Sequence, residues 1–226
     1  MLVNCDQAPS AYFERFMTSL QDGAPIDLST IRPEPRRPER RYRDPLDEVW
    51  IRAAERMGLR VVRSDAVHAD YDGQGTLAVG TARVLDPDDC LAQIIFHEVC
   101  HWLVEGRESV GLENWGLCNQ TLRDLSRENA SLRVQAALAL PYGLRGFLAN
   151  TTDHRAYYDA LPADPLARDE DHTVALAQLA LARADEPPWA PALRRALEAT
   201  AAIVAAVAPV AEPVSLYAAF EPARKV

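Results

Sequence analysis

The pentapeptide His97-Glu98-Val99-Cys100-His101 is the stretch from which the central helix and the functional site of this chain can be predicted. It fits the pattern H-E-x-x-H, which on a helix places two imidazoles one turn apart with a carboxylate beside them. Two such imidazoles can bind a catalytic metal ion, and the carboxylate then lies within reach of a water on that ion. The pattern therefore predicts that His97 and His101 are metal ligands and that Glu98 is the general base.

The residues around the pentapeptide favour a helix of about five turns. Asp86 is a suitable N-cap, Pro87 is a suitable first helical residue, and Gly106 is a typical C-terminal stop. On a helical wheel, Val99 lies opposite the two histidines among other apolar residues. We therefore expect residues 86–105 to form one helix with an apolar face in the core.

A third metal ligand must come from outside this helix, because a catalytic zinc ion commonly has three protein ligands. No histidine follows at the spacing of the longer H-E-x-x-H-x-x-G-x-x-H pattern. Glu128 is the predicted third ligand, since it lies early in a second predicted helix, residues 124–140, that one loop can return over the first. Its carboxylate should then lie within about 5 Å of both imidazoles. The other candidate ligands are Glu113, Asp124, His154 and His172.

The second predicted helix resembles part of a known family. The stretch that begins Glu128-x-x-Ser131-Leu132 and ends at Pro141 looks like the glutamate helix of the ImmA/IrrE-type metallopeptidases, which reads roughly E-x-x-A-N-x-F-A-A-x-L-L-x-P. Ser131 and Leu132 stand where that family has Ala-Asn. The resemblance covers about residues 80–145 and implies a zincin-like, gluzincin-type zinc site with Glu128 as a ligand.

A second resemblance implies a different metal. The residues His97-Glu98-x-x-His101-Trp102, followed by Gly106, are similar to those of the elongation factor P hydroxylases. In that family a downstream Glu also completes the site, and the resemblance implies iron. Two histidines and one carboxylate serve Fe(II) in non-haem oxygenases as readily as they serve zinc. The residues therefore leave Zn²⁺ and Fe²⁺ open.

The sequence as a whole predicts an α+β fold that is mostly helical. Short β-like runs, the last two joined by the turn Asp72-Gly73-Gln74-Gly75, predict a small antiparallel sheet. With the H-E-x-x-H helix and the glutamate helix, this sheet would form a zincin-like core. The expected strands cover residues 59–62, 67–71 and 76–79. The expected helices cover residues 11–20, 45–57, 86–105, 124–140, 173–183 and 188–207.

The chain divides into four predicted segments. Residues 1–43 form an N-terminal arm that ends in a Pro/Arg-rich linker, because the stretch RPEPRRPERRYR has almost nothing to bury. Residues 44–160 form the zincin-like metal-binding core, which starts with a strong helix N-terminus at Asp44-Pro45. Residues 161–208 form a helical C-terminal subdomain, and residues 209–226 form a tail.

Other conspicuous side chains are expected to pack rather than to react. Cys100 should behave as a small buried apolar residue, and Trp102 and Trp115 should be packing residues. His68 is expected to be a satisfied strand residue. Residues that follow the glutamate helix and could reach the site to stabilise an oxyanion are Tyr142, Arg145, Tyr157 and Tyr158.

Composition limits the partners and the location. The chain has 226 residues and a net charge of −9, which disfavours nucleic acid as a partner. The most apolar stretch, residues 199–211, is too short to span a bilayer. Residues 1–10 have neither a basic segment nor an apolar centre, so we expect no signal peptide, a cytoplasmic protein and reduced cysteines, whose spacing fits no zinc-binding pattern.

These observations lead to three functional hypotheses. The first is a metal-dependent hydrolase, a zinc metallopeptidase that acts on a peptide or protein, with Glu98 taking a proton from the metal-bound water. The second is an Fe(II)-dependent hydroxylase of a protein side chain. The third is a catalytically inactive binding or scaffold protein that retains a vestigial metal site. The sequence specifies neither the substrate nor the oligomeric state.

Overall fold

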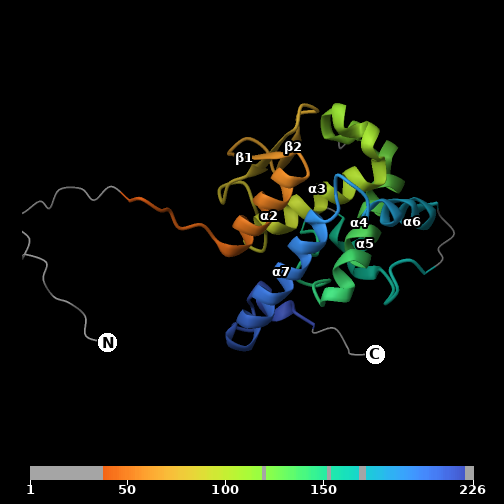
Figure 1. The fold of residues 1–226 in the computed structure, drawn as a ribbon. Coiled ribbons are helices and arrows are strands. Elements are labelled where there is room, and N and C mark those ends of the chain that lie inside the picture. Colours follow the sequence, from red (N-terminus) through yellow and green to blue (C-terminus); the bar gives the residue numbers. More distant parts are fainter. Residues whose placement is uncertain (1–37, 119–120, 152–153, 168–171, 222–226) are drawn as a thin grey trace, which may run out of the picture. The chain divides into compact units, whose positions relative to one another are not determined.

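The computed structural model describes residues 38–118, 121–151, 154–167 and 172–221 (Figure 1). By its contacts the chain separates into a unit of residues 1–42 and a unit of residues 43–226. The predicted arm lies almost entirely outside the described residues, as does the helix expected at residues 11–20. All described helices and strands belong to the second unit.

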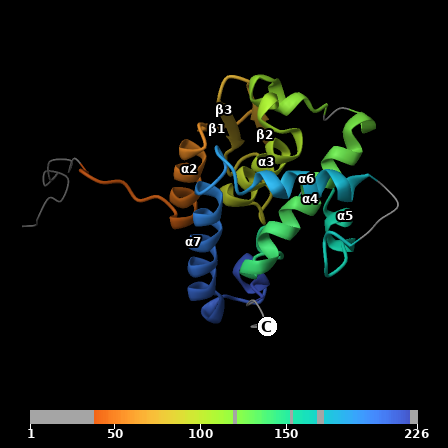
Figure 2. The same cartoon turned by 45° about the vertical axis from the view of Figure 1, so that its right-hand side comes forward.

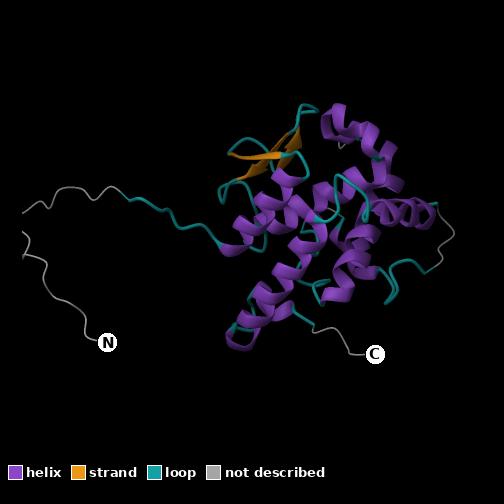
Figure 3. Ribbon diagram, viewed as in Figure 1, coloured by secondary structure: helices purple, strands orange, loops and turns teal. Residues whose placement is uncertain are grey.

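This second unit is mostly helical and contains one small sheet (Figure 3). The α+β, mostly helical fold class is therefore confirmed. Short 3-10 helices lie in the connections between the longer elements. The α-helices are α2 (Pro45–Arg56), α3 (Leu91–Glu105), α4 (Leu125–Ala139), α5 (Arg155–Ala160), α6 (Thr173–Arg183) and α7 (Ala192–Val207).

The sheet consists of β1 (Arg60–Ser64), β2 (Ala69–Tyr71) and β3 (Thr76–Gly80), in the order β1-β3-β2. β2 and β3 form the expected antiparallel hairpin, but β1 runs parallel to β3. The prediction of an antiparallel sheet was therefore wrong, and the sheet is mixed. β3 takes the central position because Leu77 and Val79 are fully buried. Residues 65–68 connect β1 to β2, which lies on the other side of β3.

Helix α3 is buried around most of its circumference, which is typical of a helix inside a core. It contacts α2, α4 and α6. Its end at Gly106 is as predicted, and this glycine has a φ of 87°, a left-handed conformation that favours a residue without Cβ. The motif therefore lies in a helix that the core holds on several sides.

The predicted start of α3 at Asp86-Pro87 was wrong, because these residues form a separate turn. The Asp89 N–H donates to the Asp86 carbonyl at 3.0 Å, and the Asp86 N–H donates to Asp89 Oδ2 at 2.7 Å. Cys90 then has an extended backbone, and its N–H donates to Gln93 Oε1 at 2.6 Å. The helix consequently begins at Leu91, one turn later than expected.

Helices α2, α4 and α6 pack against α3 (Figures 1 and 2). α2 begins after Asp44, whose carboxylate accepts from the Leu46 N–H at 2.8 Å, as predicted for an N-cap. α7 packs along α2, and the Trp50 indole N–H donates to Thr200 Oγ1 at 2.9 Å between them. α6 packs on α3 and α4. Of the helices described, none has the length and apolarity needed to cross a membrane.

Candidate metal centre

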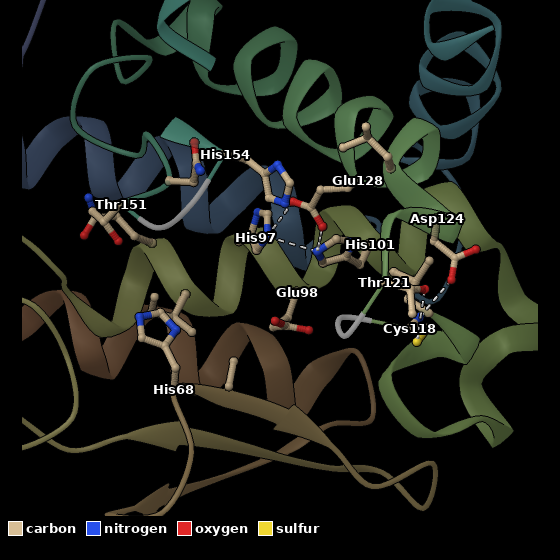
Figure 4. Close-up of a pocket in the computed structure, with 16 residues that line it drawn as sticks. His68, His97, Glu98, His101, Cys118, Thr121, Asp124, Glu128, Thr151 and His154 are labelled. Carbon is tan, nitrogen blue, oxygen red and sulfur yellow. Dashed lines mark hydrogen bonds and ion pairs between the residues drawn. The ribbon is translucent and has the colours of Figure 1, made fainter. Parts of the chain in front are cut away.

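A cavity of about 520 Å³ lies between α3, α4 and the edge of the sheet (Figure 4). His97, Glu98 and His101 of α3 and Glu128 of α4 line it. His68 and Ala69 line it on the side of the sheet, and the segment after α4 contributes residues on the other side. The motif thus faces a pocket of the size that small ligand sites occupy.

The three predicted ligands meet in this cavity. His97 Nε2 and His101 Nε2 are 2.9 Å apart. The Glu128 carboxylate places Oε1 at 3.5 Å from His97 Nε2 and Oε2 at 3.3 Å from His101 Nε2. The Glu128 carboxylate therefore lies within about 5 Å of both imidazoles, as predicted from the sequence. Of the residues that the structure describes, this is the group of His, Cys, Asp or Glu side chains that could hold a metal ion.

The tautomer of His97 follows from Gln135, a buried residue of α4. The Gln135 Nε2 donates to the Leu148 carbonyl at 2.5 Å, which leaves its Oε1 to face His97 Nδ1 at 2.9 Å. Because Oε1 can only accept, the proton of the neutral imidazole lies on Nδ1. The lone pair of His97 Nε2 therefore points into the cavity.

Ser131 orients His101 in the same way. Its hydroxyl donates to the Arg127 carbonyl at 3.1 Å, so the oxygen accepts from His101 Nδ1 at 3.1 Å. The two imidazoles then direct Nε2 lone pairs at one another across 2.9 Å, beside a carboxylate. This arrangement is repulsive unless a cation lies between the groups. The donor set and its outer partners therefore fit a metal ion.

The pKa values of His101 and Glu128 are shifted by opposing effects of burial and charge. Burial lowers the pKa of His101, and Glu128 opposes this shift. Burial by itself raises the pKa of Glu128, but the nearby His101, His97 and His154 outweigh it, so this pKa lies below its usual value. Neutral imidazole and ionised carboxylate are the metal-binding forms of these groups.

Glu98 is held by an aromatic side chain. The Trp115 indole N–H donates to Glu98 Oε2 at 3.0 Å. In Figure 4, Glu98 lies between the two imidazoles and the sheet. Trp115 is buried as predicted, and it stacks on Tyr71 with ring centroids 3.7 Å apart and on Trp102 with centroids 5.3 Å apart. Trp115, which was predicted to be a packing residue, thus also fixes the Glu98 carboxylate.

The loop that carries Trp115 has an unusual backbone. Asn114 and Trp115 have φ values of 45° and 60°, a left-handed region that asparagine tolerates but that a bulky residue such as tryptophan seldom adopts. Asn114 Oδ1 accepts from the Tyr71 N–H at 2.9 Å, and its Nδ2 donates to Asp70 Oδ1 at 3.0 Å. These bonds to β2 compensate the strain, and they cover the outer edge of β2 at Tyr71.

The other candidate ligands lie elsewhere or are engaged. Asp124 lines the cavity, but its Oδ2 accepts from the Cys118 N–H and from Arg123. Glu113 lies in the 3-10 helix Glu113–Gly116, outside the cavity lining, and His172 is exposed. His154 lines the cavity beside Glu128 and His97 (Figure 4). Of the four, His154 is the one that can reach a ligand bound near His97.

The remaining expectations have mixed outcomes. Cys100 is fully buried, as predicted, and burial raises its pKa well above the usual value. His68 precedes β2 and lines the cavity, where its Nε2 lies 3.1 Å from Asp89 Oδ2. The candidate oxyanion stabilisers are absent from the described cavity lining; they are Tyr142, Arg145, Tyr157 and Tyr158.

The sequence contained a signal for Gln135 that was missed. Glu128, Ser131 and Gln135 are spaced i, i+3 and i+7, which places all three on one face of a helix. His101 meets Ser131 and His97 meets Gln135, so α3 and α4 run antiparallel, as expected for the glutamate helix. No comparable signal marked Asn150, a buried residue of the cavity wall that lies in an irregular segment.

Comparisons of the chain with protein-family models, with curated proteins and with solved structures find no match. The site must therefore be interpreted from its own residues.

Proposed function

We propose that this protein is a zinc-dependent hydrolase that cleaves peptide bonds. The observation that carries the proposal is the position of Glu98, a carboxylate held by the Trp115 N–H next to the His97–His101 pair. Zinc bound by His97, His101 and Glu128 would supply a polarised water and a Lewis acid for the substrate carbonyl. Glu98 would accept the proton of that water and pass it to the leaving amine.

The sheet edge supports a peptide as the substrate. The Gly80 N–H donates to the His68 carbonyl, and the Asp72 N–H donates to the Thr76 carbonyl. Because residues of an antiparallel strand alternately bond toward and away from their partner strand, the N–H and C=O of Ala69 point away from β3. Ala69 also lines the cavity. An extended peptide can add to such an edge through main-chain hydrogen bonds. Because Asn114 covers the edge at Tyr71, this pairing would be short.

An Fe(II)-dependent hydroxylase would use the same three ligands. Glu98 belongs to both resemblances, but a carboxylate held beside the ligand pair has a direct role in peptide hydrolysis as the general base. We therefore favour hydrolysis. A vestigial site is less compatible with the bonds from Gln135 and Ser131, which keep both Nε2 atoms directed into the cavity.

Metal analysis of the full chain, purified without added metal, is the first test. We expect about one zinc per chain, and we expect zinc-loaded protein to cleave an unfolded substrate such as casein. Glu98→Gln should retain the zinc and lose the cleavage. Protein that binds no zinc would refute the proposal. Oxygen consumption after anaerobic Fe(II) loading, without cleavage by the zinc form, would support the hydroxylase instead.

A further inference from the structure

Asn150 is a buried amide in the cavity wall with unused hydrogen-bonding groups. It is 5% exposed and lines the same cavity as the ligand group. Its Oδ1 and Nδ2 are shielded from solvent, and neither has a hydrogen-bond partner. Buried amide groups without partners are costly and uncommon, so each such case in a native fold calls for an explanation.

The polar groups around Asn150 are already engaged. Gln93 Oε1 accepts from the Cys90 N–H at 2.6 Å, and its Nε2 donates to the Ala149 carbonyl at 3.2 Å. Thr151 and His68 both bond to the buried carboxylate of Asp89. The backbone on either side of Asn150 is thus held in place. Its side-chain amide is left available to a molecule in the cavity.

We propose that the Asn150 side chain binds the backbone of a peptide substrate. In an extended peptide, the N–H and C=O of one residue point to the same side. Asn150 Nδ2 can donate to that carbonyl while Oδ1 accepts from that N–H. Because no hydrogen bond within the protein holds the amide, its side-chain torsions are free to change when a ligand binds.

The position of Asn150 suits this role. Thr151 and His154 follow Asn150 in the chain and line the same cavity as His68, the residue before β2 (Figure 4); Thr151 and His68 meet at the Asp89 carboxylate. A substrate strand that pairs with Ala69 has a second backbone edge, which faces away from the sheet. Asn150 would bind that second edge, which makes it a specificity determinant for extended peptide backbone. This inference rests on the proposed function.

The test compares two zinc-binding probes on the zinc-loaded full chain. Acetohydroxamate has no peptide backbone, whereas a dipeptidyl hydroxamate has one. We expect Asn150→Leu to weaken the binding of the dipeptidyl hydroxamate roughly tenfold and to leave the binding of acetohydroxamate unchanged. Analogues N-methylated at each amide in turn should include one that binds the natural chain more weakly and that Asn150→Leu weakens less than it weakens the parent compound, because only the bond to the carbonyl remains to be lost.

Asn129→Leu is the matched control. Asn129 also has a buried Oδ1 without a partner, but it is not in the described cavity lining. This variant should bind both probes like the natural chain. The thermal midpoint of Asn150→Leu should equal or exceed that of the natural chain, because no bond within the protein is lost.

The outcomes separate this inference from the proposed function. Equal weakening of both probes, or a lowered thermal midpoint, would assign Asn150 a structural role and overturn the inference. Unchanged binding of both probes would also overturn it, leaving an ordered water as the amide's partner. In each case zinc content and the Glu98→Gln result still decide whether the protein is a hydrolase. Protein that binds neither zinc nor acetohydroxamate would overturn both.

Discussion

Gln135 and Asn150 are two buried amides at the same site that are used in opposite ways. Gln135 is fully buried, and both ends of its side chain bond to the protein, at His97 and at the Leu148 carbonyl. Asn150 is almost as buried, yet neither end of its amide has a partner. An amide whose bonds are complete fixes the shape of a site, whereas an amide with open bonds can recognise a ligand.

The same contrast separates the two walls of the cavity. Two buried polar residues of α4 bond to the histidines of the motif: Ser131 to His101 and Gln135 to His97. The segment around Asn150 engages its backbone but not its side-chain amide. We infer that α4 keeps the ligands in place and that the segment around Asn150 contacts the substrate.

The largest effect is expected when a ligand is removed from the α4 wall. Glu128→Ala should lower zinc affinity by more than the roughly 10–100-fold typical of a lost outer partner. Zinc content after equilibration with a zinc buffer measures this, and circular dichroism checks the fold. Full zinc retention by a folded variant would show that Glu128 is not a ligand.

The next effect tests the comparison directly. Gln135→Leu leaves His97 Nδ1 and the Leu148 carbonyl without a partner. It should lower zinc affinity by about 10–100-fold. It should also lower the free energy of unfolding of the metal-free protein by about 2 kcal/mol.

The matched variant Asn150→Leu should leave that free energy of unfolding unchanged, because its amide has no partner in the protein. Urea unfolding of both metal-free variants measures the difference. An equal loss of stability in both would mean that the two amides do not differ in the way described above.

A smaller effect is expected for the residue that holds Glu98. Trp115→Phe keeps an aromatic ring for the stack on Tyr71 but removes the N–H that binds Glu98 Oε2. We expect kcat/KM for casein-derived peptides to fall about tenfold, because a less fixed carboxylate is a poorer general base. Zinc content should not change. Loss of zinc in this variant would instead point to collapse of the strained loop.

The smallest effect is expected for Ser131→Ala. The change removes the acceptor of the His101 Nδ1 proton, so zinc affinity should fall about fivefold, the value of one hydrogen bond. Stability should change little, because alanine favours the helix and offsets the lost bond to the Arg127 carbonyl. Isothermal titration with zinc measures the affinity. A loss of zinc affinity as large as that of Gln135→Leu would mean that His97 and His101 depend equally on their hydrogen bonds to α4.

Local signals account for what could be predicted. The i, i+4 spacing of His97 and His101, the stop at Gly106 and the cap at Asp44 depend on a few neighbouring residues, and the structure has each of them. The antiparallel return of α4 was expected from the single reversing loop between the two predicted helices, which spans residues 106–124 in the structure. The turn at residues 86–89 could not be foreseen, because the buried Asp89 carboxylate bonds to His68 and Thr151, which are distant in sequence.

The sequence by itself determined the helix that carries the motif, the mostly helical class and the identity of three side chains able to bind a metal. Only the tertiary structure decided that β1 pairs parallel with β3, that Gln135 and Ser131 set the histidine tautomers, and that Trp115 holds Glu98. It also left the Asn150 amide without a partner. The physical reason is range: helix spacing and caps act over a few residues, whereas buried hydrogen bonds join residues that only the folded chain brings together.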